Sequence, residues 1–521
     1  MNSRLPLIPV YLAADVRAAD LIAQREHGLP GAILMRAAAA CALADLRERW
    51  PQAVRLVIVC GAGNNGGDGY AMAVLAKLSG LEPLVVAVGE PTRLQGDALA
   101  AYHDWRSAGG DWQAAAALPA LLQTADVAVD ALFGTGLTRP LEGPWRAAVE
   151  ALNAAPCPVQ AIDLPSGLDA NHGWPVTTAT LAGTAVRAQF TSTFVGWKPG
   201  VLLGAAYTGQ VRLHSLGVPA AAFGHAVPQL WQIPTRALLA LPARARDAHK
   251  GRHGHVMVLG GDEGMPGAVR LAGEAALRAG AGRVTVWTRG AHVGAVVAGC
   301  PELMVREAGS ACGLRERLAA ADAIVCGPGL GRWTWSREVL ADALAAAGDR
   351  PLVLDADALA LLPVVAAGRA LPPCTVLTPH PGEAARLLGI TVAQVQADRV
   401  AAVRCLADRW QATVVLKGAG TLIAGPGEVA PVVCERGNPG MGTAGLGDVL
   451  AGVCGALLAQ DRCDPAWAFG PAARTALVAL AVLAHACAGD LAATVGGERG
   501  LIATDLFAPL RLLMNGREVP G

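Results

Sequence analysis

The sequence predicts an α/β protein built from two doubly wound, three-layer domains. Short apolar runs rich in β-branched residues end again and again in glycine-rich or charged loops, and helical patterns follow those loops. The chain has 521 residues, more than one ordinary core holds. We expect a first domain at residues 1–219, a linker at 220–240 and a second domain at 241–521.

The overall composition narrows the classes of function. The formal net charge is zero, from 42 basic and 42 acidic residues, which argues against a protein that coats a nucleic acid. The twelve cysteines form no C-x-x-C pair and no zinc-spaced cluster, so we expect a reducing compartment. No signal peptide is evident, and the longest apolar run, 476–488, is too short to span a bilayer. We therefore expect a cytoplasmic protein with neither a nucleic-acid nor a membrane partner.

The stretch at residues 437–452 carries the strongest chemical signal. Its glycines and Pro439 break regular structure, and an apolar helical pattern begins at Asp448. A glycine-rich turn that runs into a helix leaves peptide N–H groups free to bind an anion. Asp448 at this position is either an N-cap or a general base beside a phosphate site, and the stretch alone favours neither.

In the first half, a predicted strand at 54–60 runs into the loop 61–69 and then into a helix. Gly61, Gly63 and Gly66 match G-x-G-x-x-G, and Glu90 ends the next strand, so an NAD-dependent dehydrogenase has to be weighed. The same loop carries two asparagines and an aspartate where a pyrophosphate would pass. These groups suit a small ligand or a cation better.

Two further loops follow predicted strands in this half. Strand 127–132 leads into 133–140, and strand 159–162 leads into 163–169. Loops at the carboxyl ends of parallel strands face one crevice, so polar residues from all three loops can converge there. Each could instead cap a turn. The residues concerned are Asn65, Asp130, Asp163 and Ser166.

The second half repeats the pattern with five strands that end in glycine, acidic or basic loops. Taken singly, the polar residues of these loops have plain alternatives as caps, turn residues or solvated side chains. Their shared position after strands, on the side expected for Asp448, favours a binding site. The loops are 260–261, 327–331, 355–357, 378–383 and 417–421.

The first-half motifs N-N-G-G-D-G, D-A-L-F-G-T-G-L and D-L-P-S-G-L-D resemble the NAD(P)H-hydrate epimerase family, the N-terminal YjeF-type, Rossmann-like fold, over about residues 10–219. The resemblance implies that Asp163 is the acid/base at the C6 centre and that Asn65, Asp130 and Ser166 ligate K⁺. It also implies that Asp163 and two loops hold the hydrated nucleotide. The loop residues are Asn64, Asn65, Gly66, Gly67, Asp68, Gly134, Thr135, Gly136, Leu137, Thr138, Arg139 and Pro140.

The second-half motifs resemble the ribokinase-like NAD(P)H-hydrate dehydratase family over about residues 244–513. They include H-K-G-R-H-G, D-A-D-A-L, T-P-H-P-G-E and K-G-A-G-T. The resemblance implies that Asp448 is the catalytic base and that ADP is the phosphoryl donor, with Mg²⁺. One departure is Ala444, where the family usually has glycine, and its methyl group is expected to narrow the anion site. The implied hydrate-binding residues are Ala268, Gly331, His380 and Asp448; those for the nucleotide are Lys417, Gly418, Ala419, Gly420, Thr421 and Gly447; those for the anion hole are Gly445, Leu446 and Gly447.

Together the two resemblances imply repair of nicotinamide nucleotides. The first domain would interconvert the (R) and (S) epimers of NADH hydrate and NADPH hydrate. The second would dehydrate the (S) form at the expense of ADP, giving AMP and phosphate. A homo-oligomer is expected. A small-molecule kinase, a dehydrogenase and a non-enzymatic first domain are the alternatives.

Overall fold

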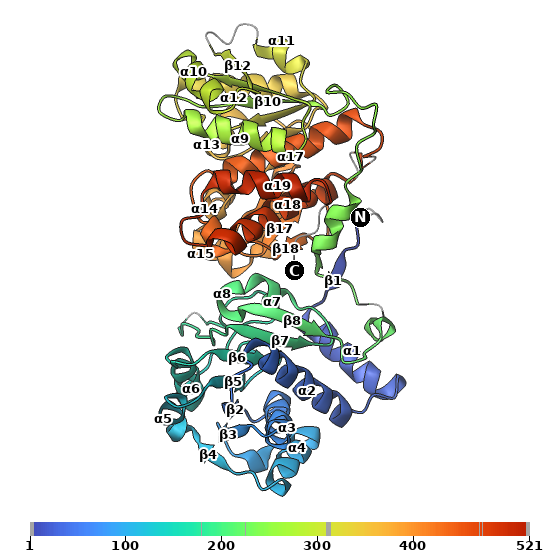
Figure 1. The fold of residues 1–521 in the computed structure, drawn as a ribbon, viewed down its shortest axis with the longest axis vertical. Coiled ribbons are helices and arrows are strands. Elements are labelled where there is room, and N and C mark those ends of the chain that lie inside the picture. The colour runs from blue at the N-terminus through green and yellow to red at the C-terminus, as the bar shows by residue number, and fades with distance from the viewer. Residues whose placement is uncertain are drawn as a thin grey trace. The chain divides into compact units, whose positions relative to one another are not determined.

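The computed structural model describes residues 5–178, 180–224, 226–308, 314–467, 469–470 and 473–516. These residues fall into two compact units, each with its own sheet (Figure 1). The N-terminal unit spans Pro9–Gln229, and the C-terminal unit takes residues 5–8 and the described residues from 230 onward.

The division at 229/230 falls within the segment 220–240, which was expected to be the linker, and part of that segment forms a strand. Strand β9 (Leu230–Gln232) lies within that segment and pairs in parallel with β18 (Val432–Cys434) of the C-terminal unit. A strand of three residues next to prolines has too short a pattern to be recognised from the sequence. The first strand, β1 (Ile8–Val10), is equally short.

The sheet of the N-terminal unit contains seven described strands, all paired in parallel, in the order β4-β3-β2-β5-β6-β7-β8. The order reverses between β2 and β5, as in a doubly wound fold. The strands are β2 (Arg55–Cys60), β3 (Glu82–Ala87), β4 (Trp112–Ala114), β5 (Val127–Ala131), β6 (Val159–Ile162), β7 (Phe190–Phe194) and β8 (Gln210–His214).

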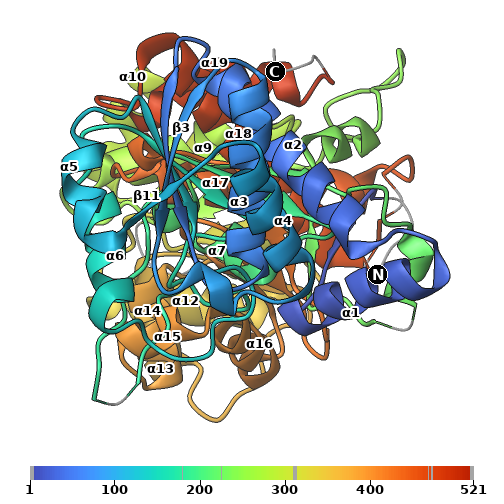
Figure 2. The same cartoon turned by 90° about the horizontal axis from the view of Figure 1, so that it is seen from below.

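Both faces of this sheet are covered, which explains the continuous apolar runs. Leu56 and Ile58 of β2 join a cluster with α2, α3 and α4, while Val57 and Val59 join a second cluster with α5 and α6. Figure 2 shows the two groups of helices on opposite sides of β3. The helices are α1 (Ala13–Glu26), α2 (Gly31–Arg49), α3 (Asn64–Leu78), α4 (Gly96–Ser107), α5 (Leu118–Leu122), α6 (Gly143–Asn153), α7 (Pro199–Leu203) and α8 (Ala205–Thr208).

The second sheet has the order β1-β9-β18-β17-β16-β15-β14-β13-β10-β11-β12. Its strands from β16 through β12 pair in parallel, and a hairpin-like antiparallel pair, β17 and β18, extends one side. The remaining strands are β10 (His255–Leu259), β11 (Arg283–Thr288), β12 (Met304–Glu307), β13 (Ala323–Cys326), β14 (Leu352–Leu354), β15 (Thr375–Leu377), β16 (Thr413–Leu416) and β17 (Thr421–Ala424).

One face of this sheet packs on α9, α17, α18 and α19 in a single large cluster. Alternate strand residues such as Ile324 and Leu354 point away from it, and α12 packs against β13 and β14. The helices are α9 (Pro266–Arg278), α10 (Val293–Gly299), α11 (Leu314–Ala319), α12 (Thr334–Ala347), α13 (Asp357–Val365), α14 (Pro381–Leu388), α15 (Val392–Ala397), α16 (Arg399–Trp410), α17 (Leu446–Cys463), α18 (Arg474–Gly496) and α19 (Phe507–Leu513).

Within the described residues, α18 is the one helix long and apolar enough to cross a membrane. However, 78% of its apolar window is buried inside the protein, so the helix belongs to the core of the C-terminal unit. The predicted pair of doubly wound α/β folds is confirmed. In both sheets, parallel pairing brings the carboxyl ends of neighbouring strands to one edge.

Candidate active sites

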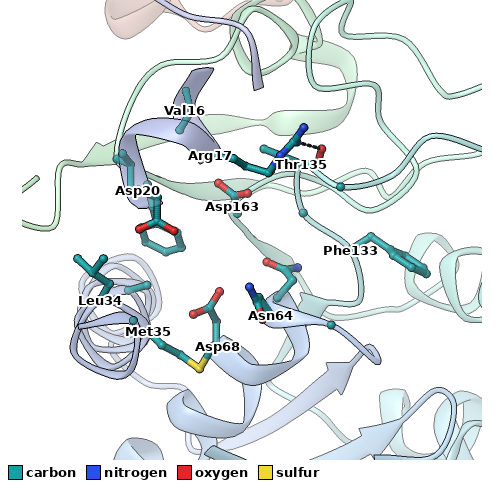
Figure 3. Close-up of a pocket in the computed structure, with 18 of the residues that line it drawn as sticks. Val16, Arg17, Asp20, Leu34, Met35, Asn64, Asp68, Phe133, Thr135 and Asp163 are labelled. Atoms are coloured by element: carbon teal, nitrogen blue, oxygen red, sulfur yellow. Dashed lines mark hydrogen bonds between the residues drawn. The ribbon is translucent and has the colours of Figure 1, made fainter. Parts of the chain in front are cut away.

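The N-terminal unit contains a cavity of about 540 Å³ at the carboxyl ends of its central strands. Figure 3 shows Asp20, Asp68 and Asp163 pointing into the same space from α1, α3 and the loop after β6. Apolar side chains of α2, among them Leu34 and Met35, form part of the wall. The cavity thus combines a carboxylate cluster with an apolar side, as a small polar ligand with a flat ring would require.

Asp163 occupies a constrained position directly after β6. Its backbone has φ of 64°, the left-handed region that aspartate tolerates better than most residues. Its carboxylate Oδ1 accepts a hydrogen bond of 2.6 Å from Lys198 Nζ, and the Lys198 side chain is 1% exposed. The same ammonium also donates to Thr193 Oγ1 (2.9 Å) and to the Phe194 carbonyl (2.8 Å). Three partners for three N–H bonds fix Asp163 in one orientation and balance its charge.

Sequence reasoning missed Lys198. It stands alone between Trp197 and Pro199, so no charge pattern marks it. Its significance depends on the pairing of β6 with β7, which brings the segment after Phe194 beside Asp163. The available signal was a lone lysine in an otherwise apolar stretch, since a buried lysine needs a partner.

The predicted binding residues at the start of α3 fall into two groups, those that line the cavity and those that do not. Asn64, Asn65 and Asp68 line the cavity, as predicted. Gly66 and Gly67 do not line it. A methyl group at Gly66 would lie 2.0 Å from the Gly61 carbonyl oxygen, and one at Gly67 would lie 2.8 Å from the Ala98 Cα atom. These glycines therefore let α3 pack closely against its neighbours.

Asp68 is the carboxyl group of the cavity with the strongest electrostatic perturbation. Burial raises its pKa well above the usual range, and the charges of Asp163 and Asp20 raise it further. Burial also raises the pKa of Asp20. A carboxyl with a raised pKa binds a proton more readily, so the site holds an ion-paired carboxylate opposite carboxyls that favour protonation.

The loop after β5 contributes part of what was expected. Gly134, Thr135, Gly136 and Leu137 line the cavity, whereas Thr138, Arg139 and Pro140 lie outside its lining. A methyl group at Gly134 would lie 2.8 Å from Asp163 Oδ2 and 3.4 Å from Asn65 Oδ1. Glycine is thus required where the three loops meet. Arg17 of α1 donates to the Thr135 carbonyl at 2.7 Å and holds the loop (Figure 3).

Asp130, Ser166 and Asn65 lie beneath this junction. Asp130 is fully buried, accepts from the Ser166 hydroxyl (2.6 Å) and peptide N–H (2.7 Å), and has a pKa raised to about 6 by burial. No described lysine or arginine forms an ion pair with it. Asn65 Nδ2 is buried without a hydrogen-bond partner. The unsatisfied Asn65 Nδ2 is a donor and cannot bind a cation, but the buried Asp130 carboxyl, the Ser166 hydroxyl and the Asn65 carbonyl oxygen are the oxygen ligands that a hard cation prefers.

In the C-terminal unit, α17 begins at Leu446, immediately after the glycine-rich loop. Gly445 has φ of 92°, and a methyl group there would lie 2.7 Å from Leu271 Cδ1, so the turn requires glycine. Ala444 is exposed and does not have positive φ, so the backbone tolerates its methyl group. The first-turn N–H groups at Leu446 and Gly447 have no intrahelical acceptor, which is the geometry of an anion hole.

Asp448 lies in the first turn of α17. Burial raises its pKa to about 7; the nearby Asp355 also raises it, and Lys417 opposes the shift. A pKa near neutrality suits a group that accepts and releases a proton at physiological pH. The raised pKa supports the interpretation of Asp448 as a general base rather than as an N-cap. No described capping hydrogen bond involves the Asp448 side chain.

Lys417 follows β16, and Asp355 follows β14. Lys417 Nζ donates to Asp355 Oδ1 at 2.8 Å, and the Thr378 hydroxyl donates to the same oxygen at 2.7 Å. A methyl group built on Gly447 would lie 3.3 Å from Lys417 Nζ and 3.5 Å from Asp355 Oδ2. The lysine, the buried aspartate and the start of α17 therefore meet at one edge of the sheet, as predicted.

The loop 418–421 turns back from β16 with its carbonyls held from behind. Gly418 and Gly420 have φ of 135° and 64°. The buried Arg399 of α16 donates to the carbonyls of Ala419 and, at 3.3 Å, of Leu416 and Lys417. Arg399 therefore holds the end of β16 and the start of the loop in place, and the glycines allow its backbone to approach a ligand closely. Arg399 was not anticipated, because nothing in a helical arginine indicates which loop it supports.

The predicted hydrate-binding residues fall in two places. Gly331, with φ of 74°, lies close to the buried Asp262, and its N–H donates to Asp357 Oδ2 at 3.0 Å. Ala268 of α9 lies beside the same loop, 3.1 Å from a methyl group built on Gly329. His380 is the N-cap of α14, where its Nδ1 accepts from the peptide N–H of Gly382 at 3.0 Å. His380 therefore has a structural role as a helix cap, whether or not it also contacts the substrate.

For metals, the described residues contain no group of three or more His, Cys, Asp or Glu side chains placed to hold an ion. We therefore assign no protein ligand set to Mg²⁺. The cation site suggested by Asn65, Asp130 and Ser166 is of a different kind, because amide and hydroxyl oxygens make up part of it.

Comparison with known proteins agrees with both resemblances. A family model described as NAD(P)H-hydrate dehydratase matches residues 256–511, and one described as YjeF-related protein N-terminus matches residues 31–200. A crystal structure of the ADP/ATP-dependent NAD(P)H-hydrate dehydratase of Bacillus subtilis, co-crystallised with ATP/Mg²⁺, is 30% identical. It covers 55% of this chain and 98% of its own, with a TM-score of 0.46.

Two curated relatives span both units. The bifunctional NAD(P)H-hydrate repair enzyme Nnr of Coxiella burnetii is 41% identical over 518 residues, which is 97% of this chain and 99% of the relative. Its namesake in Escherichia coli K12 is 38% identical over 511 residues, with coverage of 97% and 94%. The resemblances inferred from the motifs are confirmed, and the chain belongs to the family of bifunctional NAD(P)H-hydrate repair enzymes.

Proposed function

We propose that the two units catalyse two steps of one repair process. The N-terminal unit epimerises NADH hydrate and NADPH hydrate at C6, and the C-terminal unit uses ADP to dehydrate the (S) epimer. The observation that carries this proposal is that each parallel sheet presents a carboxylate beside a lysine at its carboxyl edge. These are Asp163 with Lys198 and Asp448 near Lys417.

For epimerisation, C6 of the hydrate bears both the hydroxyl group and the ring nitrogen N1. Asp163 takes the hydroxyl proton, the C6–N1 bond breaks, and its electron pair passes to N1 and the conjugated carboxamide. The resulting aldehyde rotates, N1 attacks its other face, and Asp163 returns the proton to oxygen. Lys198 holds Asp163 in place for the first step through a hydrogen bond of 2.6 Å.

For dehydration, Asp448 takes the proton of the C6 hydroxyl, whose oxygen then attacks the terminal phosphoryl group of ADP, and AMP leaves. The N–H groups of Gly445, Leu446 and Gly447 stabilise the charge on the transferring phosphoryl group. Phosphate then departs with the C6–O electron pair, N1 assists, and loss of a C5 proton restores the double bond. Phosphorylation thus replaces hydroxide, a poor leaving group, with a good one.

The remaining site residues are proposed by position. The Lys417–Thr421 loop and Gly447 would hold the nucleotide, and Ala268, Gly331 and His380 would hold the hydrate. Mg²⁺ would supply charge neutralisation for the phosphates. K⁺ held by Asn65, Asp130 and Ser166 would neutralise the buried Asp130, which accepts hydrogen bonds from Ser166, and would keep the three loops together.

The decisive assay follows the dihydronicotinamide absorbance recovered from mixed hydrate epimers, with and without ADP. We expect complete recovery with ADP and none without it. Recovery that stops at half would mean that the N-terminal unit does not epimerise. A phosphorylated hydrate that accumulates would instead favour a kinase. A homo-oligomer and a cytoplasmic location stay predictions, to be tested by light scattering and by cell fractionation.

A further inference from the structure

A buried histidine lies directly behind the proposed anion hole. His485 is 8% exposed and belongs to α18, in the middle of a long apolar run. Its Nε2 lies 2.9 Å from the carbonyl oxygen of Leu446, the first residue of α17. Burying a polar side chain in such a run costs folding stability unless the side chain forms a hydrogen bond.

The direction of this hydrogen bond follows from its acceptor. A carbonyl oxygen can only accept, so Nε2 must carry the proton and donate it. Burial, with a smaller contribution from the nearby Lys417, lowers the pKa of His485 to about 4, so the ring is neutral at physiological pH. The donor is therefore present in one fixed form wherever the enzyme works.

What His485 holds is one end of a peptide plane. The carbonyl of Leu446 and the N–H of Gly447 belong to the same planar unit and point in opposite directions. Fixing the carbonyl from inside the core therefore also fixes the direction of the Gly447 N–H, at a residue that lies close to Lys417 and Asp355. A hydrogen bond to the carbonyl also polarises the peptide and makes its N–H a stronger donor.

Two other contacts show that α18 supports the whole glycine-rich loop. Asp490 accepts from the N–H of Gly437 at 3.1 Å and from Asn438 Nδ2 at 3.0 Å. Met441 packs so tightly on the helix that a methyl group at Gly489 would lie 2.3 Å from its sulfur. The loop is thus held at both ends by α18, and His485 is the contact at its α17 end, at the proposed anion hole.

We propose that His485 is a positioning residue of the dehydratase, which aims and polarises the Leu446–Gly447 peptide of the anion hole. This inference rests on the proposed function of the C-terminal unit. It assigns to His485 no contact with substrate and no proton transfer. Its effect should appear in the transition state, where the transferring phosphoryl group gains charge at the anion hole.

The test compares three variants in the full chain. His485→Gln keeps a donor of similar reach, whereas His485→Met keeps the volume without a donor and His485→Asn is polar but too short to reach. We expect kcat for dehydration of the (S) hydrate to fall by roughly 10- to 100-fold in the Met and Asn variants. It should fall by no more than about threefold in the Gln variant, and KM for ADP should change little in all three.

Two controls separate positioning from general damage. Epimerisation by the other unit of the same chain should be unchanged in every variant. Leu480→Ala, a cavity at a fully buried apolar position of α18, should lower the melting temperature without the selective loss of kcat.

The proposal is overturned if the Met and Asn variants keep wild-type kcat, or if Gln loses as much as Met. If Met does not fold, Asn against Gln decides the same question. Failure of the wild-type enzyme to dehydrate the hydrate with ADP would instead reject the proposed function, and with it the proposed role of His485.

Discussion

The two sites use a carboxylate and a lysine in different pairings. In the N-terminal unit, Lys198 bonds directly to the proposed base Asp163, at 2.6 Å. In the C-terminal unit, Lys417 bonds to Asp355, at 2.8 Å, and only influences the proposed base Asp448 through space. Asp355 thus takes the cation that Asp448 would otherwise have, and its own charge acts on Asp448 with the opposite sign.

This difference matches the two chemistries. The epimerase base must accept a proton at the start of each turnover, and a fixed ammonium bonded to it holds it in place for that step. The dehydratase base works beside phosphates, where a lysine bonded to it would compete with the nucleotide. A pKa of about 7 leaves Asp448 able to take a proton and to release it again.

The largest expected effect is a complete separation of the two activities. Asp163→Asn should abolish epimerisation and leave dehydration of the (S) hydrate intact, whereas Asp448→Asn should do the reverse. Removing an essential acid/base group costs on the order of 10²- to 10⁴-fold in rate. Rates measured on the separated epimers test this, and loss of both activities in either variant would contradict the assignment.

The next largest effects are expected from substitution of the two lysines, each of which should affect only one of the two activities. Lys198→Met removes the only described cation bonded to Asp163 and should slow epimerisation by about 10²-fold, with dehydration unchanged. Lys417→Met leaves the buried Asp355 without its partner, so it should weaken ADP binding and also destabilise the C-terminal unit. Steady-state kinetics and melting curves measure both effects.

Lys77→Met is the matched control for the lysine variants, because this exposed lysine at the C-terminal end of α3 bonds to the Gly109 carbonyl and does not line the cavity. It should leave both rates at the wild-type level. If Lys198→Met behaves like Lys77→Met, direct pairing does not matter to the epimerase base.

The sequence was informative about loops and uninformative about what lies behind them. Strands could be located from apolar runs. Parallel pairing then brings Asp163 to the carboxyl edge of the first sheet, and Asp355 and Lys417 to that of the second. Lys198 and His485 could not be found in this way. Their partners, Asp163 and Leu446, lie 35 and 39 positions away along the chain, and only the packed fold brings them together.

Glycines show the same limit. Gly66 and Gly67 stand in a binding motif, yet steric contacts with the Gly61 carbonyl and with Ala98 account for them. A motif records that glycine is needed but does not distinguish close packing from contact with a ligand. Gly134 differs from them, because the atoms around it belong to Asp163 and Asn65 of the site.

The pH dependence of dehydration should show how the charges of Asp355 and Lys417 act on Asp448 through space. Asp448 must be ionised to act as a base, so kcat/KM should rise about tenfold per pH unit below 7 and level off above it. Asp355→Asn removes the nearest negative charge and should move the inflection to lower pH, whereas Lys417→Met should move it to higher pH. A flat profile between pH 6 and 8 would mean that Asp448 is not the group that limits the rate.

The smallest effect concerns stability. A carboxyl whose pKa is raised on folding, from about 3.9 to about 7, costs stability that grows as pH rises between these values. Asp448→Asn removes that cost, so the C-terminal unit should be more stable than wild type at pH 8, by on the order of 1 kcal/mol, and the difference should vanish toward pH 4. Denaturant unfolding at both pH values measures it. An advantage that is equal at pH 8 and pH 4 would show that Asp448 is not held away from its ordinary ionisation, and the contrast with the lysine-bonded Asp163 would then have no electrostatic basis.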